Sequence, residues 1–187
     1  MTPRLPTIAP QAATGKAKAL LEAVQTKLGL VPNMMRTLAL APAALEGYLQ
    51  LSGALGGGAL NAKTRELIAL TVGQQNGCDY CLAAHTAIGG MVGLTTDQAR
   101  DARLATSSDP RTAALLRFAA QLVEDRGRVS DADLAAVRAA GWDDGAIVEV
   151  VANVALSIFT NTFNHVAGTE VDFPAAPALE QPAGARA

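Results

Sequence analysis

The stretch Glu66–His85, ELIALTVGQQNGCDYCLAAH, decides the fold, because it holds both cysteines and one of the two histidines. Asn76-Gly77 in its middle is typical of a turn, since glycine can take a left-handed conformation that ends one helix before the next begins. We therefore expect a helix over 61–75 and a second helix starting at about Cys78. The two helices should fold back on each other as an antiparallel hairpin.

On this hairpin, chemically reactive side chains fall on one face. Cys78, Cys81 and His85 occupy positions i, i+3 and i+7 of the second helix, which places two sulfurs and an imidazole on one stripe. At a rise of about 1.5 Å per residue, Glu66 lies about 16 Å before the turn and His85 about 12 Å after it. The carboxylate and the imidazole should therefore end up nearly level.

The composition indicates an all-α protein. A chain of 187 residues fits one domain. Half of the residues are hydrophobic, only 4% are aromatic and alanine recurs throughout, which favours helices packed closely on small side chains. We expect an extended, proline-containing arm over 1–13, a single all-α domain over 14–173 and a disordered tail rich in Ala, Pro and Gly over 174–187.

Apolar spacing, caps and helix-stopping glycines predict the remaining helices. Their expected ranges are 16–28, 34–40 after an Asn33 cap, 42–55, 97–104 after a capping box from Thr95 to Gln98, 110–126, 131–140 and 145–165. The last is apolar nearly all round, so we expect it at the centre of the domain. Its most apolar run, 146–159, is shorter than the roughly 20 residues that a bilayer requires, so no membrane span is expected.

Charge and leader analysis exclude several classes of protein. The formal net charge of −2, with scattered Lys and Arg residues, provides no basic surface for nucleic acid. Residues 1–15 lack the continuous apolar core of a secretory signal, which predicts a cytoplasmic protein. In a reducing compartment, two cysteines separated by two residues indicate redox or metal chemistry and not a structural disulfide.

A CxxC at a helix start suits redox work, because the helix dipole and unpaired amides stabilise a thiolate. Cys81 lies one turn before His85, so the imidazole could take or relay its proton, and we predict that Cys81 is the attacking thiol. Cys78, nearer the helix end, would resolve the oxidised Cys81 as a disulfide and then meet an external reductant. Glu66 would hold the His85 tautomer or accept its proton.

These residues also have other interpretations. Glu66 could be a solvated carboxylate paired with Lys63 or Arg65, and the two thiols could be buried and inert. Cys78, Cys81, His85 and Glu66 could together bind a metal ion, although structural zinc usually takes ligands from two separate knuckles.

Five further residues have simpler expected roles. His165 should interact with the dipole at the end of the last helix. Asp79 and Tyr80 point off the cysteine stripe and should be surface or interface residues. Asn153 and Asn161, expected to be buried on the last helix, need polar partners and are candidates for a cavity wall.

The pattern E-x11-C-x2-C-x3-H, formed by Glu66, Asn76-Gly77-Cys78-Asp79-Tyr80-Cys81 and His85, resembles the carboxymuconolactone decarboxylase superfamily. Within it, the chain is similar to the alkylhydroperoxidase AhpD-like, peroxidase-related branch. A weaker similarity at Val31-Pro32-Asn33 extends the resemblance to about 28–94. It implies an AhpD-like helical bundle with the CxxC at the start of a central helix. It also implies a homo-oligomer, a trimer or hexamer, with active sites near the subunit contacts.

The resemblance implies the same roles as the residue-level reasoning: Cys81 attacks peroxide, Cys78 resolves, and Glu66 and His85 relay the proton. Tyr80 departs from the best-studied type of site, which has a further histidine at that position. The decarboxylase members lack the cysteine pair, which argues against lactone decarboxylation.

We therefore predict a cofactor-free thiol peroxidase that reduces hydroperoxides, organic ones above all, through a dithiol/disulfide cycle. Its partners would be a hydroperoxide, an external dithiol reductant and further copies of itself, with no nucleic acid and no membrane. One alternative is a protein disulfide oxidoreductase without real peroxidase activity. Another is a non-enzymatic metal-binding or stress-interaction module.

Overall fold

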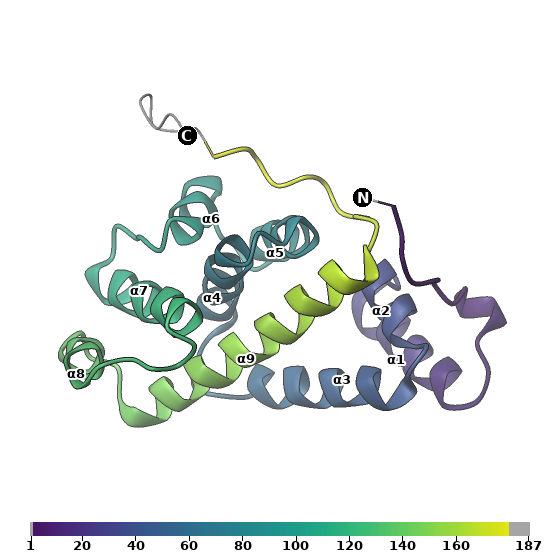
Figure 1. The fold of residues 1–187 in the computed structure, drawn as a ribbon, viewed down its shortest axis with the longest axis horizontal. Coiled ribbons are helices and arrows are strands. Elements are labelled where there is room, and N and C mark those ends of the chain that lie inside the picture. Colours follow the sequence, from purple (N-terminus) through teal and green to yellow (C-terminus); the bar gives the residue numbers. More distant parts are fainter. Residues whose placement is uncertain (1, 180–187) are drawn as a thin grey trace.

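The computed structural model describes residues 2–179, and all regular secondary structure in this part of the chain is helical (Figure 1). The all-α prediction is confirmed. The elements are a short 3-10 helix at Pro10–Ala12, α1 (Gly15–Leu28), α2 (Asn33–Leu38), α3 (Pro42–Gly56), α4 (Ala62–Gln75), α5 (Asp79–Met91), α6 (Thr96–Arg103), α7 (Pro110–Glu124), α8 (Asp131–Ala139) and α9 (Asp144–Ala167).

Helix α4 lies at the centre of the molecule, where it packs against α5, α6, α7 and α9. Its residues Ile68, Leu70 and Val72 are completely buried. We expected α9 in this position, and that expectation is wrong. Helix α9 crosses α3, α4, α5 and α7 but keeps an open apolar face, with Val148 68% and Val151 46% exposed. An apolar side chain on an open face cannot be told from a core residue by sequence pattern.

Helix α9 is close to its predicted range of 145–165 and continues beyond the apolar run 146–159 to Ala167. Of the helices within residues 2–179, it alone is long and apolar enough to cross a bilayer by length and composition. Core helices of soluble proteins share that property, so it is weak evidence for a membrane span.

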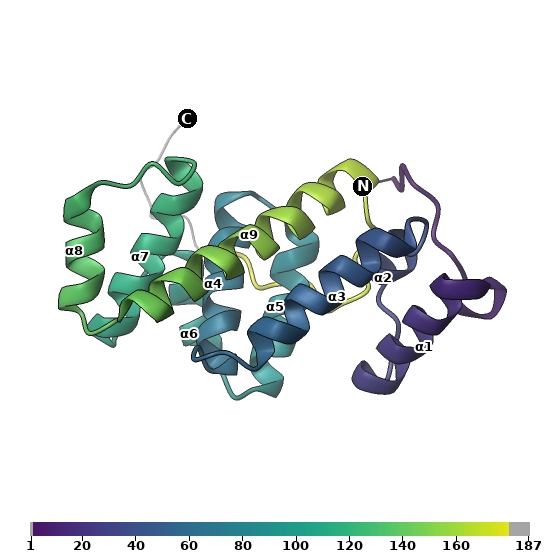
Figure 2. The same ribbon diagram turned by 90° about the horizontal axis from the view of Figure 1, so that it is seen from below.

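Two hydrophobic clusters fill the interior. One lies among α4, α6, α7, α8 and α9, and the other among α1, α2, α3 and α5. Figure 2 shows α7 and α8 at one end of the molecule and α1 and α2 at the other, with α4 and α5 between them. Helix α5 contributes to both clusters, with Leu82 in the first and Cys81 in the second. The cysteines therefore lie where the two clusters meet.

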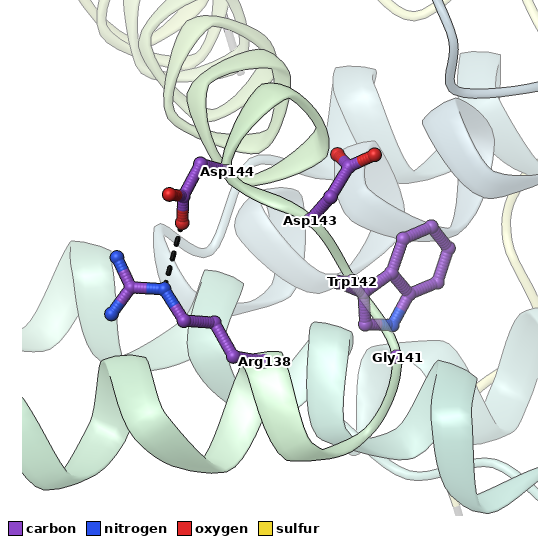
Figure 3. A pocket seen from close by; sticks show the side chains of 5 residues that line it. All are labelled: Arg138, Gly141, Trp142, Asp143 and Asp144. Carbon is purple, nitrogen blue, oxygen red and sulfur yellow. Dashed lines mark hydrogen bonds and ion pairs between the residues drawn. The ribbon is translucent and has the colours of Figure 1, made fainter.

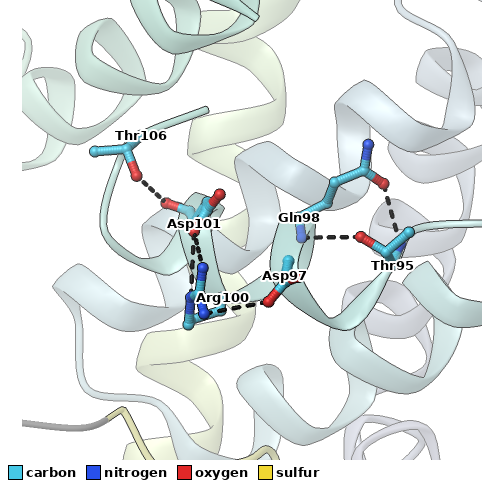
Figure 4. Close-up of polar contacts among 6 residues, drawn as sticks. All are labelled: Thr95, Asp97, Gln98, Arg100, Asp101 and Thr106. Carbon is cyan, nitrogen blue, oxygen red and sulfur yellow. Dashed lines mark hydrogen bonds and ion pairs between the residues drawn. The ribbon is translucent and has the colours of Figure 1, made fainter. Parts of the chain in front are cut away.

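Side-chain caps fix several helix starts. The Asn61 side chain accepts a hydrogen bond from the Thr64 amide at 3.0 Å, and Thr95 with Gln98 forms the predicted capping box of α6. Figure 4 shows that box beside Arg100, which pairs with acidic neighbours on the same helix. Asn33 is not a cap: α2 begins at this residue, and its side-chain amide donates to the Glu170 carbonyl instead.

The N-terminal arm meets the C-terminal end of α9. The amides of Arg4 and Leu5 both donate to the Ala167 carbonyl, at 2.8 and 3.1 Å. Gly168 has a φ of +59°, and a Cβ there would lie 2.7 Å from the Thr2 carbonyl oxygen, so the close passage of the arm requires glycine.

After α9 the chain continues along α2 and α5 to α6. The Asp172 carboxylate accepts from the Asn33 amide at 2.7 Å, and the Arg103 guanidinium donates to the Pro177 carbonyl. In Figure 1 this segment is the yellow coil that follows α9. The prediction of a disordered tail concerned 174–187, of which 180–187 lie outside the described residues.

Candidate active site

The turn between α4 and α5 is built by hydrogen bonds that also position the cysteines. Gly77 has a φ of +61°, as the Asn76-Gly77 pair predicted. The Gly77 amide donates to the Gln74 carbonyl at 3.1 Å and the Cys78 amide to the Gly73 carbonyl at 2.9 Å, which is a Schellman motif. Cys78 then acts as the N-cap of α5, because its Sγ accepts from the Cys81 amide at 3.4 Å. Cys78 therefore takes part in both the C-terminal motif of α4 and the N-terminal cap of α5.

Cys78 and Cys81 are free thiols, each only 2% exposed, with their sulfurs 2.7 Å apart. The hydrogen bond from Cys78 is the largest cause that lowers the pKa of Cys81, which falls to about 6 although burial opposes the shift. The charge of His85 and the side-chain amides of Asn164 and Asn161 lower the pKa further. That same hydrogen bond, with burial and the Cys81 charge, raises the pKa of Cys78 far above its usual range. The pair therefore favours a thiolate on Cys81 and a proton on Cys78.

The hairpin brings Glu66 and His85 together, with Glu66 Oε2 2.7 Å from His85 Nδ1. Their side chains are 16% and 26% exposed. Burial by itself lowers the pKa of His85, but the charge and the hydrogen bond of Glu66 outweigh it, so the net pKa is raised. The alternative pairing of Glu66 with Lys63 or Arg65 does not occur, and Arg65 donates to the Leu60 carbonyl instead.

His85 influences Cys81 through charge, and each group shifts the pKa of the other. In the described part of the chain, no direct hydrogen bond joins the imidazole to Cys81 Sγ. Because Nδ1 is engaged by Glu66, Nε2 is the ring nitrogen that remains available to a bound molecule.

Helix α9 adds polar groups that the sequence indicated only in part. The Asn164 amide Nδ2 lies 3.3 Å from Cys81 Sγ, a contact that we did not predict. Asn161 accepts a hydrogen bond from the Asn76 side chain at 2.8 Å, so it borders the site as expected. His165 Nε2 contacts the Asn76 carbonyl at 2.9 Å and ties α9 to the turn.

Asn153 behaves differently, since it bonds the Glu149 carbonyl of its own helix at 2.8 Å and does not border the site. The pattern that could have revealed Asn164 is its three-residue spacing from Asn161 in an otherwise apolar helix. Amides buried at such spacing need partners on the facing helix.

Tyr80 is not a surface residue, contrary to the prediction: it is 4% exposed. Its ring packs edge-on against Phe173 with centroids 5.8 Å apart, and its hydroxyl accepts from the Met34 amide at 3.3 Å. The segment after α9 and helix α2 cover this turn of α5, and neither is close to it in the sequence.

Tyr48 of α3 also belongs to the neighbourhood of the site, and nothing in its local sequence indicated this. Burial is the largest cause that raises the pKa of Tyr48 to about 12, and the charges of Glu66 and Cys81 raise it further. Its ring helps to form an apolar groove of about 340 Å³ between α3 and α9. The other lining residues are Ala43, Ala44, Gly47, Leu51, Ala155, Leu156 and Phe159.

A second hollow, of about 400 Å³, lies at the corner between α8 and α9 (Figure 3). Its Arg138 Nε pairs with Asp144 at 2.7 Å, and Trp142 Nε1 donates to the Arg111 carbonyl at 2.9 Å. These polar groups have partners within the corner itself, so we assign the hollow to helix packing. Within residues 2–179, no group of three or more His, Cys, Asp or Glu side chains is arranged to hold a metal ion.

Comparison with known proteins agrees with this arrangement. A family model for the carboxymuconolactone decarboxylase family matches residues 42–125, a range that contains Glu66, Cys78, Cys81 and His85. An alkylhydroperoxidase AhpD core structure, a peroxidase-related protein from Ralstonia eutropha JMP134, is 28% identical with a TM-score of 0.80. The match covers 91% of this chain and 92% of that one. Over this range, the chain is similar to the carboxymuconolactone decarboxylase family.

Further solved structures share this fold. A peroxidase-related protein from Silicibacter sp. TM1040 is 25% identical with a TM-score of 0.78, covering 91% of this chain and 94% of that one. The debrominase Bmp8, as a cysteine-to-alanine variant in complex with 2,3,4-tribromopyrrole, shares the fold with a TM-score of 0.78 at 16% identity, covering 92% and 93%. No curated protein sequence matches the chain.

Proposed function

We propose that this AhpD-like protein is a thiol peroxidase in which Cys81 reduces hydroperoxides. The observation that carries the proposal is that the α4–α5 hairpin holds both a hydrogen-bonded cysteine pair, at the start of α5, and a Glu66–His85 pair that joins the two helices. A thiolate nucleophile with a proton donor beside it is what peroxide reduction needs.

In the proposed cycle, the Cys81 thiolate attacks the terminal oxygen of ROOH. The O–O bond breaks, a sulfenic acid forms on Cys81, and the leaving alkoxide takes a proton from His85 to give the alcohol. The Cys78 thiol then displaces the sulfenic hydroxyl as water and closes the disulfide. An external dithiol restores both thiols by exchange, which returns the two electrons delivered to the peroxide.

The burial of the cysteines supports a small-molecule oxidant. With each cysteine 2% exposed, the resting thiols are easier to reach for a small hydroperoxide than for a folded protein. The apolar groove beside Tyr48 is suited to an organic residue, so we propose organic hydroperoxides. The cycle needs no cofactor, and a reducing cytoplasm would keep the thiols ready.

We further propose that the protein works as a homo-oligomer, a trimer or hexamer, held by α9. Its open face carries residues at alternating three- and four-residue spacing, the pattern of a helix-pairing seam: Val148, Val151, Ala155, Ile158 and Thr162, all exposed. The occupant would be the same seam of a second copy, which would also cover the groove between α3 and α9.

The direct test is peroxide consumption with an external dithiol by the wild type, Cys81→Ser and Cys78→Ser. We expect turnover in the wild type, none in Cys81→Ser, and a single turnover that leaves a trappable sulfenic acid in Cys78→Ser. Unchanged turnover in Cys81→Ser would disprove the assignment. Negligible peroxide rates together with a trapped mixed disulfide through Cys78 would favour a protein disulfide oxidoreductase.

A further inference from the structure

The last turns of α9 present a buried amide directly to the attacking sulfur. Asn164 is 4% exposed, and its Nδ2 lies 3.3 Å from Cys81 Sγ and 3.5 Å from Met34 Sδ. Asn153, equally an asparagine buried in α9, bonds only its own helix backbone. The contact with Cys81 therefore reflects the position of Asn164 and not a general property of the helix.

Met34 determines which end of the amide faces the sulfurs. A thioether sulfur can only accept a hydrogen bond, so the NH₂ end of Asn164 is directed toward Met34 and Cys81 together. A donor aimed at Cys81 favours its thiolate over its thiol, because a charged acceptor forms the stronger hydrogen bond. The amide of Asn161 acts in the same sense on the pKa of Cys81.

The other end of the same amide lacks a partner. Asn164 Oδ1 is buried, and nothing in the described part of the chain donates a hydrogen bond to it. An unsatisfied buried carbonyl oxygen costs free energy, and a donor on a bound molecule would recover it. A hydroperoxide presents a donor of the right kind, since the oxygen that the thiolate attacks carries the O–H.

We propose that Asn164 is a catalytic residue that holds the Cys81 thiolate through its NH₂ group and the hydroperoxide O–H through its carbonyl oxygen. This inference rests on the proposed peroxidase function. The S–O bond forms as the O–O bond breaks, the hydroxyl with its proton moves onto sulfur, and the alkoxide leaves toward His85 for its proton. Asn164 thus orients the transferred hydroxyl, while His85 protonates the leaving alkoxide.

The test uses Asn164→Leu, close in shape but without donor or acceptor, with Asn153→Leu as the matched control. The first readout is the pH dependence of Cys81 alkylation by iodoacetamide in the reduced protein, followed by mass spectrometry, which does not require peroxidase activity. We expect its midpoint to rise by about one pH unit or more in Asn164→Leu and to stay within about 0.3 units in Asn153→Leu.

The second readout is kcat/KM for an organic hydroperoxide at a pH where Cys81 is ionised in every variant. We expect a further loss of about tenfold or more in Asn164→Leu, because the carbonyl contact to the O–H is gone. A folded Asn164→Leu with wild-type midpoint and rate overturns the role of Asn164. A wild type without turnover contradicts the proposed function itself, while the alkylation midpoint still tests the contact with sulfur.

If Asn164→Leu fails to fold, Asn164→Asp replaces it, because the carboxylate has nearly the same shape. It removes the donor and adds a negative charge beside the sulfur, so its alkylation midpoint should rise by more than about one unit. A wild-type midpoint in Asn164→Asp would equally overturn the proposal.

Discussion

Glu66 Oε2 and His85 Nδ1 lie 2.7 Å apart, although the two residues come from different helices and are separated by the whole α4–α5 turn. The contact raises the pKa of His85 against the opposing effect of burial. It therefore keeps the imidazole protonated, and able to give its proton to the leaving alkoxide, at a pH where Cys81 is already a thiolate.

This relationship predicts a bell-shaped pH profile that depends on Glu66. Activity should rise as Cys81 ionises, with a pKa of about 6, and fall at higher pH as His85 loses its proton. Glu66→Gln removes the charge that raises the pKa of His85, so the alkaline limb should move to lower pH and the rate at about pH 8 should fall by about 10- to 100-fold. The measurement is kcat/KM against pH, with the exposed Glu22→Gln as control. An alkaline limb that stays in place would argue against the relay.

The reactivity of Cys81 should depend on Cys78. Because the Cys78 hydrogen bond is the largest cause of the low pKa of Cys81, Cys78→Ala should raise the alkylation midpoint of Cys81 from about 6 toward its ordinary value of 9.0. The iodoacetamide rate measured from about pH 5 to about pH 10 checks this. If the midpoint stays at its wild-type value in Cys78→Ala, the Cys81 thiolate is stabilised by His85 and the α9 amides and not by Cys78.

Assembly should depend on the open face of α9. The double variant Val151→Glu and Ile158→Glu places two charges in the proposed seam, so the oligomer should dissociate to monomers in sedimentation or light-scattering experiments. Leu104→Glu, at a residue that is 54% exposed on another surface, is the matched control and should leave the assembly intact. Dissociation by both variants, or by neither, would remove α9 from the interface.

Stability should respond in opposite directions at two glycines. Gly77 has a φ of +61° and open space where a Cβ would stand, so Gly77→Ala should lower the free energy of unfolding by about 1 kcal/mol through backbone strain alone. Gly53 lies inside α3 with ordinary helical geometry and equally open space, so Gly53→Ala should raise it by about 0.5–1 kcal/mol. Urea unfolding of both variants measures the difference. A neutral Gly77→Ala would mean that the turn relaxes without cost.

Much of the helical framework could be predicted from local signals. Asn61, the capping box of Thr95 and the Asn76-Gly77 turn act through neighbours within a few residues, so the sequence is enough to place them. The Asn33 cap prediction failed because Asn33 is itself the first residue of α2: its Oδ1 accepts from the Arg36 side chain, and its amide donates to the distant Glu170 carbonyl.

The sequence by itself determined the hairpin, and with it the approach of Glu66 to His85 and of Cys78 to Cys81, because helical periodicity and one left-handed glycine are enough to define those positions. Only the tertiary structure decided that Asn164 contacts the Cys81 sulfur, that Met34 and Tyr48 lie near the site, and that Tyr80 is buried. These contacts join helices far apart in the chain, and they depend on how α2, α3 and α9 pack around α5, which no local pattern encodes.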